Sequence, residues 1–421
     1  MSTATGPAIV ETRCCIVGGG PAGMMLGYLL ARSGVDVVIL ERHADFFRDF
    51  RGDTIHPSTL ELMHELGILE DLLRQPHQEQ QRFEFRIGRD RVLGPDFSRL
   101  PTRCKFMVFM PQWDFLNFLA GKAKRYRGFH LVMQADVTDL ARDGERITGA
   151  VAATPGGEIA VRAALVVGTD GRHSTVREKA GLESVALGSP IDVLWMRISR
   201  RPDDPEQILG TFDAGKGLVM LNRGDYWQCG YIIPKGTLDG LKQRGIAALR
   251  NDILALVPWL HGRVNELEGW DDIKLLTVMV DRLVEWYRPG VLCIGDAAHA
   301  MSPIGGVGIN LAIQDAVAAA NILAPALRGS RTSVEPLRSV QRRRELPTRL
   351  TQALQVLIQD RVINPMLTGG AMRTMTMVIW MLRRLGFLRH LLARALGVGF
   401  RPEHVRTPDV LVEDAPSGER R

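Results

Sequence analysis

Apolar residues near the N-terminus form two short runs on either side of a glycine-rich segment. Residues 13–17 and 35–40 are mainly apolar, and the second run is rich in β-branched side chains, so both are typical of buried strands. Residues 24–31 suit a helix between them, and Gly34 suits the position after its C-terminus. The order of strand, glycine turn, helix and strand predicts a βαβ unit.

The rest of the chain alternates between strand-like and helix-like patterns. We expect strands within 83–98, 129–167, 187–233 and 291–294, and helices at 57–66, 114–124 and 310–327. Turns are expected at Asp143-Gly144, at Gly156-Gly157, and within 200–205 and 223–225. After about residue 330 the pattern is mostly helical, with breaks expected at Pro347, Pro365 and Gly369-Gly370.

This succession of elements predicts an α/β fold in three parts. A Rossmann-like nucleotide-binding domain is expected to comprise residues 1–74, 101–180 and 275–330. A β-sheet substrate domain, made of residues 75–100 and 181–274, is expected as an insertion into it. Residues 331–421 are expected to form a helical C-terminal part.

Composition narrows the class of protein. Of the 421 residues, 45% are hydrophobic and 24% are charged, which is ordinary for a globular protein and excludes a disordered chain. The formal net charge of +6 suits an anionic partner such as a phosphate-bearing cofactor or a lipid surface, and does not indicate nucleic acid. The five cysteines, an odd number without a C-x-x-C pair, are expected to be reduced thiols of a cytoplasmic protein. We expect no metal site and no signal peptide.

Gly18, Gly20 and Gly23 form the pattern G-x-G-x-x-G directly after the first strand. Gly18 permits a tight turn, Gly20 lets the backbone approach a pyrophosphate, and Gly23 lets the helix pack closely on the strand. The N-terminus of that helix presents free N–H groups to phosphates. Glu41, at the end of the second strand, can accept hydrogen bonds from ribose hydroxyls. Together these features favour a dinucleotide site over a plain glycine-rich turn.

Two later motifs indicate which dinucleotide. Residues 170–174 read Asp-Gly-Arg-His-Ser, with Arg177 after them. Residues 295–299 read Gly-Asp-Ala-Ala-His, followed by Pro303 and by residues 305–310, which read Gly-Gly-x-Gly-x-Asn. In this order, the three motifs resemble those of the group A FAD-dependent aromatic monooxygenases, the p-hydroxybenzoate-hydroxylase-like family. The resemblance extends over residues 14–315, although 181–274 share only a strand-like character.

The resemblance implies an FAD site along these motifs. It implies pyrophosphate contacts at Gly18, Gly20, Pro21, Ala22 and Gly23, ribose contacts at Glu41 with Arg42 beside it, and backbone contacts to adenine at Val137. It implies Arg51 near the pyrophosphate and flavin, Gln112 and Asp296 at the ribityl chain, and Asp170 in a motif linked to both FAD and NAD(P)H. It implies that the isoalloxazine is wrapped by Pro303, Gly305, Gly306, Gly308, Ile309 and Asn310. The helix that starts there would stabilise the ring edge that becomes anionic on reduction.

Some of these residues also have plainer interpretations. Asp296 can cap a helix, His299 suits a structural histidine, and Arg51 can be a surface arginine. The substrate end is marked less clearly. The catalytic candidates are His56 and Tyr231, and Trp227, Tyr231 and Phe212 can either line an aromatic pocket or belong to the core.

The function that the resemblance implies is hydroxylation of an aromatic small molecule. NAD(P)H would reduce FAD, O2 would form a flavin C4a-hydroperoxide, and its distal oxygen would pass to the ring. A flavin-dependent halogenase or a reductase on the same scaffold is the alternative, although the halogenase motif W-x-W-x-I-P is matched only faintly by residues 227–234. A flavin-bearing module without catalysis is a third interpretation. The substrate, the choice of NADH or NADPH, the catalytic base and the oligomeric state stay open.

The segment 374–405 is rich in apolar and aromatic residues with several arginines. It can be a helix packed on the body of the protein. Alternatively, it can be an interfacial amphipathic helix that makes peripheral membrane contact and captures an apolar substrate.

Overall fold

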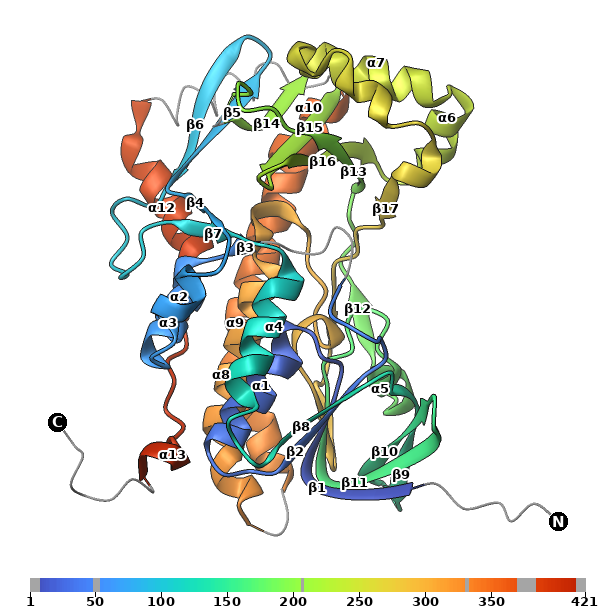
Figure 1. Ribbon diagram of the computed structural model, residues 1–421, viewed down its shortest axis with the longest axis vertical. Helices are drawn as coiled ribbons and strands as arrows, with labels where there is room; N and C mark the ends of the chain where they lie inside the picture. Colours follow the sequence, from blue (N-terminus) through green and yellow to red (C-terminus); the bar gives the residue numbers. More distant parts are fainter. Residues whose placement is uncertain (1–7, 48–53, 206–207, 330–332, 369–383, 414–421) are drawn as a thin grey trace.

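The computed structural model describes residues 8–47, 54–205, 208–329, 333–368 and 384–413. The lower half in Figure 1 is built on a mostly parallel sheet in the order β19-β20-β11-β1-β2-β8. β1 (Ala8–Val17) pairs in parallel with β2 (Val37–Glu41) and with β11 (Gly157–Gly168), which confirms the expected βαβ unit. The outer strands are β8 (Phe129–Met133), β20 (Val291–Cys293) and β19 (Tyr287–Arg288). Antiparallel β9 (Asp136–Asp143) and β10 (Arg146–Thr154) extend from β11 through the two expected glycine turns.

Three long helices pack together beside this sheet. They are α1 (Pro21–Arg32), α4 (Gln112–Ala123) and α8 (Gly308–Leu327). Among the described residues, only the helical stretch Ile304–Leu327 is long and apolar enough to cross a membrane, and 78% of its most apolar window is buried inside the protein. A helix that is apolar all round is expected in the core of a protein of this size, so the core position accounts for its composition.

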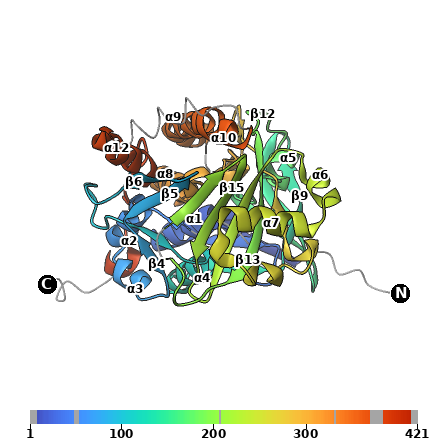
Figure 2. The ribbon, with the colours of Figure 1, turned by 90° about the horizontal axis from the view of Figure 1, so that it is seen from above.

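A second sheet forms the upper half in Figure 1, in the order β17-β13-β16-β15-β14-β5-β6. Its strands are β5 (Arg82–Ile87), β6 (Asp90–Asp96), β13 (Ile191–Ser199), β14 (Ile208–Asp213), β15 (Lys216–Asn222), β16 (Tyr226–Pro234) and β17 (Lys274–Leu276). Two segments far apart in the chain therefore build one sheet, because β14 pairs with β5. Helices α6 (Leu238–Gln243) and α7 (Ile246–Leu256) cover its outer face (Figures 1 and 2).

The C-terminal part is helical, as expected. α9 (Val334–Ile358) packs on α8 and is followed by a π-helical turn (Gln359–Ile363) and by α10 (Asn364–Thr368). The break predicted at Pro347 is wrong, because this buried proline lies inside α9. A proline inside a helix loses one backbone hydrogen bond, and the side chains buried on both sides of it hold the helix in place. Pro365 lies in α10 just after the π-helical turn, and residues 369–370 lie outside the described part of the chain.

Shorter elements join these layers. A small sheet is made of β3 (Thr54–Ile55), β7 (Met107–Phe109) and β4 (Gln78–Gln80). Further short elements are α2 (Pro57–Glu65), α3 (Leu69–Leu73), α5 (Thr175–Lys179), β12 (Ser184–Ala186), β18 (Asp281–Leu283), α12 (Gly386–Gly397) and α13 (Val410–Glu413). Figure 2 shows that α9, α10 and α12 gather on one side of the upper sheet, while α7 lies across another part of it.

Candidate active site

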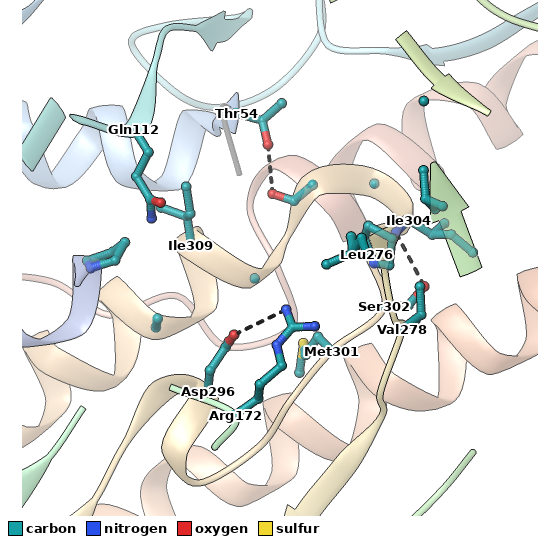
Figure 3. A pocket seen from close by; sticks show the side chains of 18 of the residues that line it. Thr54, Gln112, Arg172, Leu276, Val278, Asp296, Met301, Ser302, Ile304 and Ile309 are labelled. Atoms are coloured by element: carbon teal, nitrogen blue, oxygen red, sulfur yellow. Dashed lines mark hydrogen bonds and ion pairs between the residues drawn. The ribbon is translucent and has the colours of Figure 1, made fainter. Parts of the chain in front are cut away.

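One cavity of about 960 Å³ runs from the glycine turn after β1 to the inner face of the upper sheet. Both sheets and the C-terminal helices contribute residues to its walls. Figure 3 shows its middle part, where side chains from α4, α8 and the segment before α8 come together. A cavity of this size is large enough to hold a small organic ligand or cofactor.

The glycine turn has the backbone geometry that the sequence predicts. Gly18 has a φ of +102°, which favours glycine. A Cβ on Gly23 would lie 2.0 Å from the carbonyl oxygen of Gly18, so glycine is needed for α1 to approach β1. A Cβ on Gly20 would meet no protein atom closer than 3.9 Å, because Gly20 borders the cavity together with Pro21 and Ala22. The binding of a pyrophosphate against this open backbone stays a prediction.

The end of the cavity expected to hold adenosine is lined by Glu41, Arg42 and Val137. The Glu41 carboxylate accepts a hydrogen bond from the Gly19 N–H at 2.8 Å, and its other oxygen lies 2.6 Å from Nδ1 of His43. The oxygen beside Nδ1 also accepts a hydrogen bond from the His43 N–H at 3.1 Å, and contact of Glu41 with a ribose hydroxyl stays a prediction. Glu41 therefore also holds the glycine turn against the end of β2.

Asp170 lines the cavity but also organises its own motif. Its carboxylate accepts hydrogen bonds from the Ser174 hydroxyl at 2.6 Å and from the Val176 N–H at 3.1 Å. Burial raises the pKa of Asp170 above its ordinary value, although these hydrogen bonds oppose the shift. The side chain thus shapes the turn between β11 and α5, and its contacts with FAD or NAD(P)H stay predictions.

Asp296 faces the cavity from the segment after β20, with about a third of its side chain exposed. Nη2 of Arg172 approaches its carboxylate at 3.9 Å (Figure 3). Nη1 of Arg172 donates to the carbonyl of Thr277 at 3.2 Å. This open carboxylate suits the predicted contact with ribityl hydroxyls. No role was predicted for Arg172 from the sequence, although it lies inside the motif at 170–174.

A buried ion network lies behind the Asp296 segment. The Asp315 carboxylate of α8 is 2.6 Å from Nε2 of His299 and accepts hydrogen bonds from the Gly295 N–H at 3.1 Å and from Nε of Arg344 at 2.8 Å. His299 is therefore a structural histidine, which is the role that its plainer interpretation from the sequence assigns to it. Burial alone would raise the pKa of Asp315, but His299 and Arg344 outweigh burial and hold it below its ordinary value. Asp315 and Arg344 were not predicted from the sequence, because they lie on different helices.

The loop before α8 is tied to β3. Gly305 and Gly306 have φ values of +75° and +62°, and a Cβ on Gly306 would lie 2.1 Å from Oγ1 of Thr54. That hydroxyl donates to the Gly306 carbonyl at 2.9 Å (Figure 3). The Asn310 amide donates to the Thr54 carbonyl at 3.0 Å and accepts from the His56 N–H at 2.8 Å. Asn310 thus braces the loop, whereas the cavity itself is lined by Pro303, Gly305, Gly306, Gly308 and Ile309.

These residues fit FAD. The first turns of α1 and α8 both border the cavity, and among the described residues no side chain caps either helix. Their free N–H groups therefore face the ligand space. The end of α1 suits a pyrophosphate, and the end of α8 suits the negative charge of a reduced flavin ring. Gln112 and Asp296 line the cavity near the start of α8 (Figure 3), while Arg51 lies outside the described residues.

The two residues expected to be catalytic do not line the cavity. His56 is completely buried, with Nδ1 2.7 Å from the carbonyl oxygen of Leu396, and burial lowers its pKa to about 4. A neutral His56 therefore joins the loop region to α12. Tyr231 faces α7, where its hydroxyl donates to Asp252 at 3.3 Å, and burial raises its pKa. The structure corrects both expectations, because neither side chain can reach a ligand in the cavity as it stands.

Strand alternation explains the position of Tyr231. Trp227 and Tyr231 share the face of β16 that packs under α7, whereas Gln228, Gly230 and Ile232 line the cavity on the opposite face. The aromatic pocket expected from Trp227, Tyr231 and Phe212 is therefore correct only for Phe212.

Beyond the loop, the cavity opens into a largely apolar chamber between the upper sheet and the C-terminal helices. The sheet side includes Phe85, Val193, Trp195, Phe212, Val219 and Leu221. The helix side includes Leu354, Ile358, Val362, Ile363, Leu392 and Leu396. The sequence pattern predicts the helices of this region but not their place at the cavity.

The segment 374–405 is described only from residue 384 onward. There α12 packs on the body, because Ala393 is buried and a Cβ on Gly397 would lie 2.7 Å from the ring of Phe97. Phe387 and Leu391 of the same helix are exposed. Peripheral membrane contact stays a prediction.

Two further sequence expectations concern thiols and metals. All five cysteines are free and buried. In the part of the chain that the structure describes, no group of three or more His, Cys, Asp or Glu side chains could hold a metal ion.

Comparisons with known proteins agree with this geometry. A family model described as an FAD binding domain matches residues 11–353. The chain is 34% identical over 368 residues to a 6-methylpretetramide 4-monooxygenase of Streptomyces rimosus, covering 86% of this chain and 87% of the relative. It is 30% identical over 317 residues to a dialkyldecalin synthase of Streptomyces rugosporus, covering 72% of this chain and 63% of the relative, so it spans less than two thirds of that relative's length.

A solved structure of pqsL, a probable FAD-dependent monooxygenase from Pseudomonas aeruginosa, shares the fold. The TM-score is 0.72 at 22% sequence identity, with 86% of this chain and 99% of that chain covered. The matched family model, the 34% identical relative and the cavity bordered by two uncapped helix starts lead to one conclusion. The chain belongs to the family of FAD-binding monooxygenases.

Proposed function

We propose that this protein hydroxylates an aromatic small molecule, with O2 as the oxygen source and NAD(P)H as the electron donor. The observation that supports this proposal most strongly is a continuous cavity, in which the residues predicted to bind FAD lie next to an apolar chamber. When bound in the cleft, FAD supplies the redox chemistry that amino-acid side chains lack.

The chain's own residues hold the cofactor and prepare the chamber. The glycine turn and Asp296 bind the polar parts of FAD, and the N-terminus of α8 stabilises negative charge at the ring. Phe212, Val219 and the helices on the other side of the chamber exclude water around an aromatic substrate, which favours oxygen transfer over loss of electrons to H2O2. Because His56 and Tyr231 do not line the cavity, the proposal assigns neither of them as a base.

Isotope labelling tests the proposal. Flavin-loaded protein is incubated under 18O2 with NADH or NADPH and a panel of phenols, quinolones and 6-methylpretetramide, the last because of the relative that carries its name. Mass spectrometry should show one 18O atom in the product from O2 and none when the label is in water. A halogenated product when halide is supplied would favour the halogenase alternative. A reduced product without label would favour the reductase.

The variant Asp296→Ala links the activity to the cleft. A hydrogen bond to a charged group contributes about 1.5–3 kcal/mol, so loss of this carboxylate should weaken FAD binding while the chain still folds. Labelled product should fall in proportion to the flavin lost on dilution. Full flavin occupancy in Asp296→Ala would contradict the assigned contact.

A further inference from the structure

Gln228 is a buried polar side chain in the wall of the apolar chamber. It lies on the cavity-facing side of β16, next to Gly230 and Ile232, and only 5% of it is exposed. Its neighbours across the sheet are Leu221 on β15 and Arg197 on β13. A polar side chain in such a wall costs free energy unless its hydrogen-bonding groups find partners.

One end of the Gln228 amide has a partner within the protein. Nε of Arg223 donates to Oε1 of Gln228 at 3.2 Å. This bond fixes the orientation of the amide, since an arginine can only donate and must therefore meet the oxygen. The NH2 group is consequently the free end. A charged donor on Oε1 also polarises the amide and makes its N–H groups stronger donors.

The free end faces the chamber. Nε2 of Gln228 has no hydrogen-bond partner among the described residues. It is also not one of the fully buried polar atoms without a partner, so part of its surface is accessible. Gln228 lines the cavity, so the open space next to its side chain is the chamber.

The wall beside this amide suits an aromatic ring. Gly230 pairs with Trp195 across the sheet, and a Cβ on Gly230 would lie 3.0 Å from the Trp195 ring. The missing side chain therefore leaves room for the indole, which lines the chamber next to Gln228. An aromatic ligand packed against this indole brings its substituents within reach of the amide.

We infer that Gln228 selects aromatic substrates that carry an oxygen acceptor, either a carbonyl or a phenolate oxygen, by donating a hydrogen bond from Nε2. The inference rests on the proposed function, because it names the class of compound that the chamber takes. Gln228 thereby determines specificity and orientation. The hydrogen bond holds the substrate oxygen at the sheet and thereby sets which carbon is hydroxylated.

A matched pair of probes tests this hydrogen bond. 2-Acetylnaphthalene and 2-isopropenylnaphthalene have nearly the same shape, but only the ketone has an acceptor. Binding to the flavin-loaded protein is followed by the change in flavin absorbance, which needs no turnover. The native protein should bind the ketone about ten-fold more tightly, because an unused buried donor is costly.

Two variants and a control assign the preference to Gln228. Gln228→Met keeps the length of the side chain but has no donor, so it should bind both probes equally or favour the hydrocarbon. Gln228→Glu has no donor either and can pair with Arg223, so it should lose the preference as well. Gln243→Met, at the exposed end of α6, should keep the ten-fold preference.

The outcomes separate this inference from the proposed function. Equal binding of the two probes by the native protein, or a ketone preference that survives in Gln228→Met, would overturn the role of Gln228. Labelled product from 18O2 alongside equal probe binding would leave the proposed function intact. Selective ketone binding without labelled product would leave the hydrogen bond intact and refute the hydroxylase.

Discussion

Replacement of Arg344 by Met should destabilise the protein strongly, because the buried carboxylates of Asp315 and Glu403 each lose a cationic partner. The Arg344 side chain is 1% exposed and donates from Nε to Asp315 at 2.8 Å. Its Nη1 also lies 3.3 Å from Glu403 and donates to the Arg401 carbonyl at 3.1 Å. Breaking a buried ion pair by removing one partner costs about 3–5 kcal/mol.

The matched control is Arg342→Met on the same helix. The Arg342 side chain is 65% exposed and pairs with Glu335 at the surface. Exposed pairs contribute about 0–1 kcal/mol, so this variant should stay close to the native protein. Urea unfolding of the three proteins without flavin, followed by circular dichroism and fluorescence, measures the difference. An Arg344→Met protein within about 1 kcal/mol of the native one would refute the reasoning.

The stability of Arg344→Met should also depend on pH differently from that of the native protein. Asp315 has a folded pKa below its ordinary value, so its stabilising contribution is present above the unfolded pKa and is lost as the pH falls through the folded pKa. Arg344→Met removes one of the two residues that lower this pKa, so the acid loss of stability should begin at a higher pH. FAD affinity should fall too, because Asp315 also holds the Gly295 N–H beside Asp296. An acid profile parallel to that of the native protein would contradict the assignment.

Three further predictions follow from the cavity walls and the core. Gly20→Ala should weaken FAD binding, because its Cβ enters the cavity, and should leave the unfolding free energy of the flavin-free protein nearly unchanged. Gly23→Ala should instead destabilise the fold, because its Cβ would lie 2.0 Å from a backbone oxygen. Titration with FAD and urea unfolding distinguish the two effects. Tyr231→Phe should cost about 1 kcal/mol of stability, because it loses the hydrogen bond to Asp252, and should keep full NAD(P)H-dependent turnover per bound flavin; a turnover rate that falls instead would restore a catalytic role. All five cysteines are buried, and burial raises their pKa values, to about 12 for Cys15 and about 11 for Cys104. They should therefore not react with a thiol reagent such as Ellman's reagent until urea unfolds the chain. Fast reaction of the native protein would argue against this packing.

Features that depend on neighbouring residues could be predicted from the sequence alone. A left-handed turn at Gly18 and the close approach of α1 at Gly23 are local demands of the backbone, and only glycine meets them. The order of apolar runs around these glycines was enough to predict the βαβ unit. The loop at 303–310 was recognisable for the same reason, because its glycines and its asparagine are close together in the chain.

Contacts between side chains that are distant in the sequence could not be predicted in this way, because they depend on how the elements pack. β16 is buried on both faces, so its alternation of side chains carries no sign of which face lines the cavity. Tyr231 was therefore placed wrongly, and Gln228 was overlooked. The contacts of Asn310 with Thr54 and of Asp315 with Arg344 join residues from separate elements, and no local pattern records them. Such pairs form because a buried polar group must find a partner wherever the packing brings one.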